Sequence, residues 1–222
     1  MGGTDAGPGR GGVLPGAVRG GLAVTAVLAA LVVVALGVRY GGDGAPGRVD
    51  ARVWGLTGGP GPSWRAFAEA VDFLGEPVGA AALVLGTATG CLLLRRPRAA
   101  VLVVAGTGAA VAATTLLKPA VGRTIHGGHL AFPSGHTGFL TAYALVVALL
   151  VAGRLGLGRP AGLSLVLAAG TAAGAVMGWA QIVLDAHYPT DVLGGWATAL
   201  AVVPATAWAV DRVAGTGPRT GR

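Results

Sequence analysis

The sequence predicts an all-α fold, a bundle of six transmembrane helices. Composition is the first indication, because 53% of the 222 residues are hydrophobic and only 11% are charged. A soluble domain carries about 25% charged residues, so the bilayer is the expected solvent for most of this surface. The second indication is that apolar runs of about 20 residues, enough to cross a bilayer, occur repeatedly. They cover residues 20–38, 77–94, 99–117, 137–153, 161–184 and 192–210.

The ends of the chain lie outside these runs. The first run is long and no small-residue cleavage site follows it, so it is interpreted as an uncleaved span. Residues 1–16 and 214–222 are predicted to be disordered tails, which leaves a membrane domain over residues 17–213.

The net charge is +7, but the basic residues punctuate apolar runs instead of gathering on a soluble domain. This pattern argues against nucleic acid as a partner.

Basic residues predict the orientation of the six spans. With both termini on one side of the membrane, that side carries ten Lys or Arg residues and two acids. The opposite side carries six Lys or Arg residues and seven acids. By the positive-inside rule the termini are cytoplasmic, and the cluster of Arg95, Arg96 and Arg98 is the strongest indication. The loops at 118–136 and 185–191 then face outward.

The first outer loop, residues 39–76, is expected to begin with an irregular stretch because it is rich in glycine and proline. From Ser63, a suitable N-cap, apolar residues recur at helical spacing as far as Leu74. This pattern predicts a short helix on the membrane interface, with Trp64 anchored among the lipid headgroups. A direct role in admitting lipid is the alternative.

The four histidines fall in two outer loops or at their membrane edges. The first of these loops starts at Lys118, the only lysine, passes Arg123, and ends with Ser134, Gly135 and His136. Lys118 and Arg123 supply two fixed cations. Ser134 and Gly135 stand just before a predicted helix, where free N–H groups and the helix dipole favour an anion. Together these residues predict a phosphate-binding site.

The other loop contributes an Asp–His pair. His187 and Asp191 are four residues apart, and Asp191 falls in the first turn of the sixth span if that helix begins near Pro189. A carboxylate bonded to one imidazole nitrogen raises the basicity of the ring, so the other nitrogen can act as nucleophile or base. His136 is then the candidate general acid for the leaving oxygen.

Structural interpretations compete with these chemical ones. A lysine at a membrane edge is often an anchor, Pro-Ser-Gly is often a helix cap, and a His–Asp pair is often a structural hydrogen bond. A zinc site is a further alternative, with His126 and His129 joined by His136 or His187. Two glycines between His126 and His129 indicate a flexible loop, however, and the nearby cations would repel a metal. The sequence therefore favours a site without metal or other cofactor.

These residues resemble the type 2 phosphatidic acid phosphatase family, which includes membrane lipid phosphatases. The family pattern has a lysine followed after six residues by Arg-Pro, then Pro-Ser-Gly-His. It continues with Ser-Arg, five residues, His, three residues and Asp. Here Pro-Ser-Gly-His is intact at residues 133–136, and His187 and Asp191 stand at the family interval. The order and spacing match over about residues 118–191, and the six-span layout matches along the chain.

The resemblance implies a role for each matching residue. His187 would take the phosphoryl group, Asp191 would be its partner, and His136 would protonate the leaving oxygen. The residues that hold the phosphate oxygens would be Lys118, Ser134 and Gly135.

Two positions depart from the family pattern. The Arg-Pro of the first motif is Ile125-His126 here, and Arg123, two residues earlier, is the candidate replacement for the arginine. The Ser-Arg of the third motif is Ala180-Gln181. Gln181 can still donate an N–H to phosphate, but charge-assisted hydrogen bonds are roughly twice as strong as neutral ones.

The function implied is a membrane phosphatase that hydrolyses the phosphate or pyrophosphate ester of a lipid at the outer membrane face. It would act through a phosphohistidine intermediate on a phosphatidic acid-like lipid or a polyprenyl phosphate, without a cofactor. One alternative is a non-catalytic lipid-binding or transport-associated relative with a degenerate phosphate site. The other is a lipid phosphotransferase, which passes the phosphoryl group to an acceptor other than water.

Overall fold

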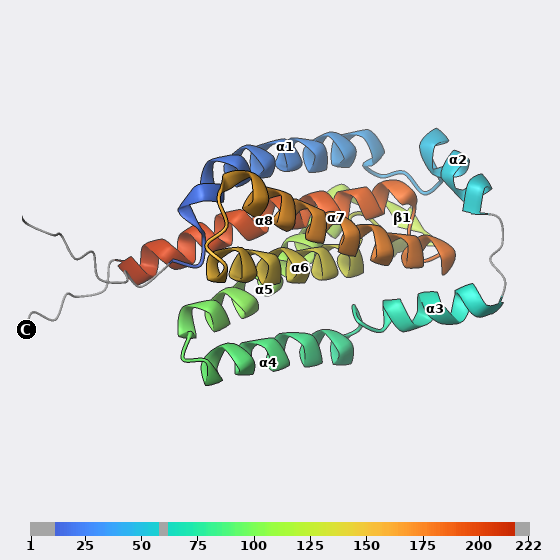
Figure 1. Cartoon of the computed structure of the whole chain (residues 1–222). Helices are drawn as coiled ribbons and strands as arrows, with labels where there is room; N and C mark the ends of the chain where they lie inside the picture. The colour runs from blue at the N-terminus through green and yellow to red at the C-terminus, as the bar shows by residue number, and fades with distance from the viewer. Residues whose placement is uncertain (1–11, 58–61, 216–222) are drawn as a thin grey trace, which may run out of the picture.

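The computed structural model describes residues 12–57 and 62–215. Within these ranges the chain forms eight helices and one short antiparallel hairpin, and the long helices lie side by side (Figure 1). The elements in chain order are α1 (Gly16–Tyr40), α2 (Arg48–Thr57), α3 (Pro62–Asp72), α4 (Pro77–Leu93), α5 (Pro97–Val121), β1 (Thr124–Ile125), β2 (His129–Leu130), α6 (Gly135–Arg154), α7 (Arg159–Val183) and α8 (Pro189–Gly215).

Five helices of the described chain are long and apolar enough to cross a membrane, namely α1, α5, α6, α7 and α8. The sixth candidate span is the pair α3–α4, which bends by 56° at a short break before Pro77. Helix α4 by itself nearly coincides with the second predicted span. The predicted all-α bundle is therefore confirmed, with its second span in the bent pair.

Proline and glycine set several helix boundaries. Helices α4 and α5 begin at Pro77 and Pro97. Proline is favoured there because an N–H in the first turn of a helix has no intrahelical acceptor, so its absence costs no hydrogen bond. Helix α5 ends before Gly122, whose φ of 68° is a left-handed conformation that glycine adopts without strain. This cap turns the chain from α5 into the hairpin and brings Arg123 into the interior.

Helices α6 and α8 form the centre of the bundle. Helix α6 packs against α5, α7 and α8, and α8 also packs against α1 and α5. Glycine permits the close approach of α8 to the start of α6, since a Cβ at Gly195 would overlap the Ser134 carbonyl oxygen. On the outside of α1, Val27 and Leu31 are 61% and 60% exposed, which suits contact with lipid chains.

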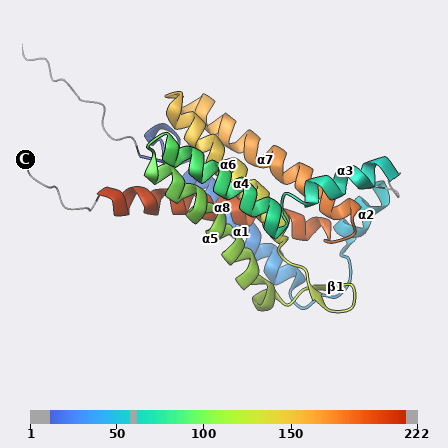
Figure 2. The same cartoon turned by 90° about the horizontal axis from the view of Figure 1, so that it is seen from below.

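The first outer segment differs in part from the prediction. The stretch expected to be irregular contains the helix α2, whose Asp50 is fully buried. The predicted interfacial helix is present as α3, which extends beyond the end of α4 (Figure 2). Its Trp64 and Phe67 are 60% and 51% exposed, and both rings contact Trp179 of α7. The segment therefore covers one end of the bundle instead of forming a loose loop.

The N-terminal tail is shorter than expected. Val13 and Leu14 are buried, and their backbone N–H groups donate to the Asp211 carboxylate at 2.7 and 3.0 Å. At the other end of the chain, α8 continues to Gly215. The predicted disorder of the tails concerns residues 1–11 and 216–222, which lie outside the described residues, and stays a prediction.

Candidate functional site

The histidine-bearing loops lie at one end of the bundle, here called the site end. It carries the β1–β2 hairpin, the turn between α7 and α8, and the helices α2 and α3 (Figures 1 and 2). The opposite end carries the beginning of α1 and the end of α8 (Figure 1). Lys118, His136 and Asp191 each act electrostatically on His187, so these four residues form one cluster.

His187 and Asp191 lie around the start of α8, which begins at Pro189 as the sequence predicts. The Nδ1 of His187 is 3.7 Å from Asp191 Oδ2, an electrostatic contact longer than a hydrogen bond. His187 is only 8% exposed. Burial lowers the pKa of its imidazole below the usual value, an effect that Asp191 opposes and Lys118 reinforces. The ring is therefore held in the neutral form that a nucleophile requires.

Arg123, which the sequence suggested as a phosphate ligand, is paired with two carboxylates inside the protein. Its guanidinium is fully buried, with Nη2 2.7 Å from Asp50 Oδ2 and Nη1 2.6 Å from Asp191 Oδ1. The rings of Tyr40 and Tyr188 lie against it, 4.3 and 4.4 Å from its central carbon. Because two carboxylates already satisfy its charge, Arg123 fixes Asp191 rather than a phosphate.

Asp50 connects this arginine to the first turn of α8. Its Oδ1 accepts the Thr190 N–H at 2.9 Å, and its Oδ2 accepts the Thr190 hydroxyl at 3.1 Å. The same hydroxyl accepts a hydrogen bond from Arg123 Nη1 at 2.6 Å. Asp50, Arg123, Thr190 and Asp191 thus form a buried ion network that positions the partner of His187.

The start of α6 lies against the first turn of α8. Ser134 is fully buried and caps the helix, because its Oγ accepts the Thr137 N–H at 3.4 Å. Its own N–H donates to the Asp191 carbonyl at 2.9 Å, which joins this loop to α8. The hydroxyl expected to bind phosphate is thus used as a cap. The N–H groups of Gly135 and His136, in the first turn, have no intrahelical acceptor and are the groups left for an anion.

Lys118 lies in the last turn of α5, within the cluster, as the sequence predicts. Its Nζ donates to the Leu130 carbonyl of β2 at 2.8 Å. An ammonium group has three donors. The hairpin can therefore hold the lysine while a second N–H binds a phosphate oxygen.

Two carboxylates that the sequence did not indicate face His136. Its Nε2 lies 3.6 Å from Asp72 Oδ1 and 3.5 Å from Glu76 Oε1. The same oxygen of Asp72 accepts the Gln181 side-chain N–H at 2.5 Å. Gln181, expected to contact phosphate, is therefore engaged with Asp72. A Cβ at Gly75 would overlap the His136 ring, so the backbone there lies directly against the imidazole.

His126 and His129 lie in the hairpin. His126 Nε2 is 2.6 Å from the Asp185 carbonyl oxygen and 3.3 Å from its carboxylate, which links the two outer loops. His129 is exposed. Among the side chains that the structure describes, the one group spaced to hold a metal ion contains neither of them. The described residues therefore do not form the zinc site that the sequence left as an alternative, which would use His126 and His129 as ligands.

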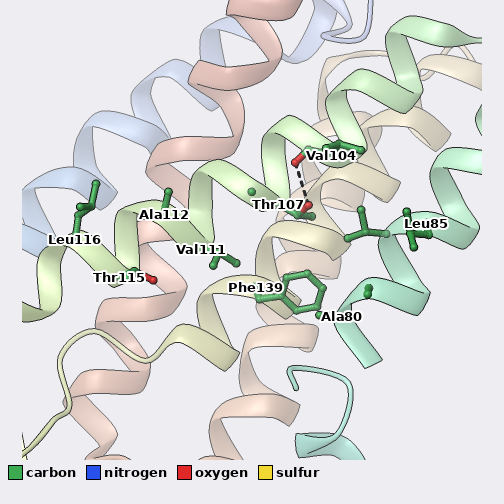
Figure 3. A pocket seen from close by; sticks show the side chains of 12 residues that line it. Ala80, Leu85, Val104, Thr107, Val111, Ala112, Thr115, Leu116 and Phe139 are labelled. Atoms are coloured by element: carbon green, nitrogen blue, oxygen red, sulfur yellow. Dashed lines mark hydrogen bonds between the residues drawn. The ribbon is translucent and has the colours of Figure 1, made fainter. Parts of the chain in front are cut away.

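An apolar groove of about 700 Å³ lies between α4, α5 and α6 (Figure 3). Ala80 in the first turn of α4, Leu116 near the end of α5, and Phe139, three residues after His136, contribute to its lining. One end of the groove therefore lies next to the site end, and the rest follows the spans. Its course along the spans and its apolar lining suit a hydrocarbon chain.

Comparison with known proteins identifies the family of the chain. A search of curated protein sequences finds no match. The chain is similar to the crystal structure of a transmembrane PAP2 type phosphatidylglycerolphosphate phosphatase from Bacillus subtilis. The TM-score is 0.66 at 19% identity, over 89% of this chain and 99% of that one. A family model described as the PAP2 superfamily matches residues 80–214, more than half of the chain. The resemblance carried by the motifs is thus confirmed, and the chain belongs to the PAP2 superfamily.

Proposed function

We propose that this protein is a lipid phosphatase whose site lies at the outer face of the membrane. The observation that carries the proposal is the cluster of His187, Asp191, His136 and Lys118 beside one end of the apolar groove. A phosphate headgroup in the cluster leaves its hydrocarbon chain in the groove, so the lipid need not leave the membrane. Family membership and a fold neighbour described as a phosphatidylglycerolphosphate phosphatase support this class of substrate.

The reaction proceeds in two steps. The His187 nitrogen that does not face Asp191 attacks phosphorus, and a P–N bond forms as the P–O bond to the leaving group breaks. His136 gives its proton to the leaving oxygen, and Asp191 stabilises the positive charge that develops on His187. Water then attacks phosphorus and gives a proton to His136, and the new P–O bond forms as the P–N bond to His187 breaks and inorganic phosphate leaves.

The phosphate oxygens are held by Lys118 and by the N–H groups of Gly135 and His136 at the start of α6. Arg123, Ser134 and Gln181 act through other residues: Arg123 holds Asp191, Ser134 caps α6, and Gln181 holds Asp72.

The orientation follows from the distribution of charge. Arg95 and Arg96 lie in the turn between α4 and α5, and Arg98 lies in the first turn of α5, at the end of the bundle opposite the site end (Figure 1). By the positive-inside rule that end is cytoplasmic, together with both termini. The protein is then a multi-pass membrane protein whose site faces the extracytoplasmic side.

Hydrolysis without added metal tests this function. Purified in detergent with EDTA, the full chain is expected to release phosphate from at least one of phosphatidic acid, phosphatidylglycerolphosphate and a polyprenyl pyrophosphate. His136→Ala should lower kcat by about 10²–10⁴-fold, the usual contribution of a general acid. If the wild type hydrolyses none of these lipids, the site is degenerate and the proposal fails. Transfer of phosphate to an alcohol in preference to water would instead indicate a phosphotransferase.

The pH dependence of hydrolysis follows from the environment of His187. The nucleophile must be neutral, and burial lowers the pKa of His187, so the neutral form persists below the usual value of about 6.5. We expect kcat/KM to fall on the acidic side only below this pH. Asp191 raises the pKa of His187, so Asp191→Asn should move the acidic limb to still lower pH while reducing the rate. An acidic limb above pH 6.5 in the wild type would contradict this assignment.

A further inference from the structure

Asp72, Glu76 and His136 form a cluster of three metal-ligand groups, of which the proposed mechanism uses His136 alone. Asp72 ends α3 and Glu76 precedes α4, so the two carboxylates stand on either side of the 56° bend. One possible ligand atom from each residue lies within 4.8 Å of the other two. The cluster is partly exposed, since the side chains of His136, Asp72 and Glu76 are 29%, 26% and 51% exposed.

The two distances from His136 to the carboxylates fit a tetrahedral zinc site. Zinc binds imidazole nitrogen and carboxylate oxygen at about 2.0–2.2 Å, so two ligand atoms of a tetrahedron stand about 3.3–3.6 Å apart. His136 Nε2 lies 3.6 Å from the Asp72 oxygen and 3.5 Å from the Glu76 oxygen. These two separations match the edges of a zinc tetrahedron, and the two carboxylate oxygens stand within 4.8 Å of each other. Three protein ligands would leave the fourth position of the ion for water or a phosphate oxygen.

The ligand types favour zinc over the hard cations. Mg²⁺ and Ca²⁺ prefer oxygen ligands throughout, whereas an imidazole nitrogen suits zinc. The Nε2 atom of His136 is itself buried and has no hydrogen-bond partner within the described chain. It therefore directs an unused lone pair or N–H toward the two carboxylates.

Gln181 supports such a site by holding one of its carboxylates in place. It is buried and donates to the Asp72 oxygen that faces His136, which orients the carboxylate. The family pattern has an arginine at position 181, and its charge would neutralise Asp72 and repel a cation. The neutral amide of Gln181 orients the carboxylate but does not cancel its charge. The negative charges of Asp72 and Glu76 are thus left to attract a divalent ion.

We propose that Asp72, Glu76 and His136 bind Zn²⁺ and that the bound ion inhibits hydrolysis. The inhibitory part rests on the proposed function. Nε2 of His136 cannot hold a metal and a proton together, so the zinc-bound protein lacks the acid that protonates the leaving oxygen. The ion is thus an inhibitor and not a cofactor, and hydrolysis proceeds in EDTA. A protonated His136 paired with both carboxylates would satisfy the same contacts without metal, and direct titration separates the two cases.

Calorimetric titration of ZnCl₂ into the detergent-purified full chain, freed of metal with EDTA and dialysed, tests the site. One zinc per chain is expected, with no comparable binding of Mg²⁺. Asp72→Asn and Glu76→Gln should each weaken zinc binding by about tenfold or more. Glu69→Gln, on the same helix as Asp72, is the matched control. This variant should bind zinc as the wild type does, because Glu69 is exposed and pairs with Arg65. Absent zinc binding, or binding that survives Asp72→Asn and Glu76→Gln together, overturns the proposal.

Inhibition is measured separately from binding. Saturating Zn²⁺ should lower lipid hydrolysis by about 100-fold, in line with the loss of a general acid, and EDTA should restore it. Whatever activity remains in Asp72→Asn should resist zinc. Zinc that binds the cluster without slowing hydrolysis overturns the inhibitory role.

A variant without the nucleophile separates the zinc proposal from the proposed function. His187→Ala should bind zinc with wild-type affinity, so the site can be measured whether or not any lipid is hydrolysed. A wild type that binds zinc but hydrolyses no lipid refutes the phosphatase and supports the site. A wild type that hydrolyses lipid but binds no zinc refutes the site alone.

Discussion

Replacing His187 with alanine is expected to reduce turnover by about 10⁴-fold or more on every lipid that the wild type hydrolyses. Alanine offers neither a nucleophile nor a base. The Asp191 carboxylate is not free to take over the attack, because it is held by Arg123 at 2.6 Å and by the Tyr188 N–H at 3.1 Å. Phosphate release in detergent measures the loss.

Trapping of the intermediate makes this test specific for nucleophilic attack. With radiolabelled lipid phosphate, acid-labile and base-stable label is expected on the wild-type chain and not on His187→Ala. His129→Ala is the matched control, because this histidine is exposed in the hairpin and its rate should stay within about twofold of the wild type. More than a tenth of wild-type activity in His187→Ala would show that another group attacks phosphorus.

Replacing Asp50 with alanine is expected to lower the free energy of unfolding by about 3–5 kcal/mol, the usual cost of removing one partner of a buried ion pair. The variant leaves Arg123 Nη2 and the Thr190 N–H without the carboxylate that each contacts at 2.7 and 2.9 Å. For a chain of this length the loss corresponds to a fall in melting temperature of about 6–20 °C. Thermal unfolding in detergent measures it.

A second aspartate in the same segment provides the control for Asp50. Asp43 also pairs with an arginine, but it stands 3.9 Å from Arg39 and both side chains are exposed. Asp43→Ala should therefore cost less than about 1 kcal/mol. Equal melting temperatures for the two variants would show that the buried ion network does not stabilise the fold. Activity should fall in Asp50→Ala and not in Asp43→Ala, because only Asp50 belongs to the network that positions Asp191.

The spans were predictable because a bilayer imposes a simple rule on the sequence. A run of apolar residues long enough to cross hydrocarbon must form a helix that satisfies its own backbone hydrogen bonds. The prediction was least accurate in the first outer segment, where glycine and proline suggested an irregular loop. Helix α2 forms there, and its Asp50 is buried against a residue 140 positions later in the chain. No local pattern contains a contact of that range.

The candidate site was predictable where the motif residues are close in sequence. His187 lies just before α8 and Asp191 lies in its first turn, and Ser134 to His136 fall at one helix start, so their spacing carries geometric information. The roles of Arg123 and Gln181 were not predictable in the same way. Both were assigned to phosphate because they stand near the motifs, and both are engaged with aspartates of the first outer segment.

The sequence by itself determined that the chain is an all-α membrane bundle of the PAP2 superfamily and which end of that bundle carries its histidines. Hydropathy and short motif spacings are local properties, and they survive in a linear chain. Only the tertiary structure decided which charges face one another there. Asp50 neutralises Arg123 and Asp72 faces His136 because α2 and α3 fold back over the site end. Electrostatic energy depends on distance in space and on burial, and neither can be inferred from distance along the sequence.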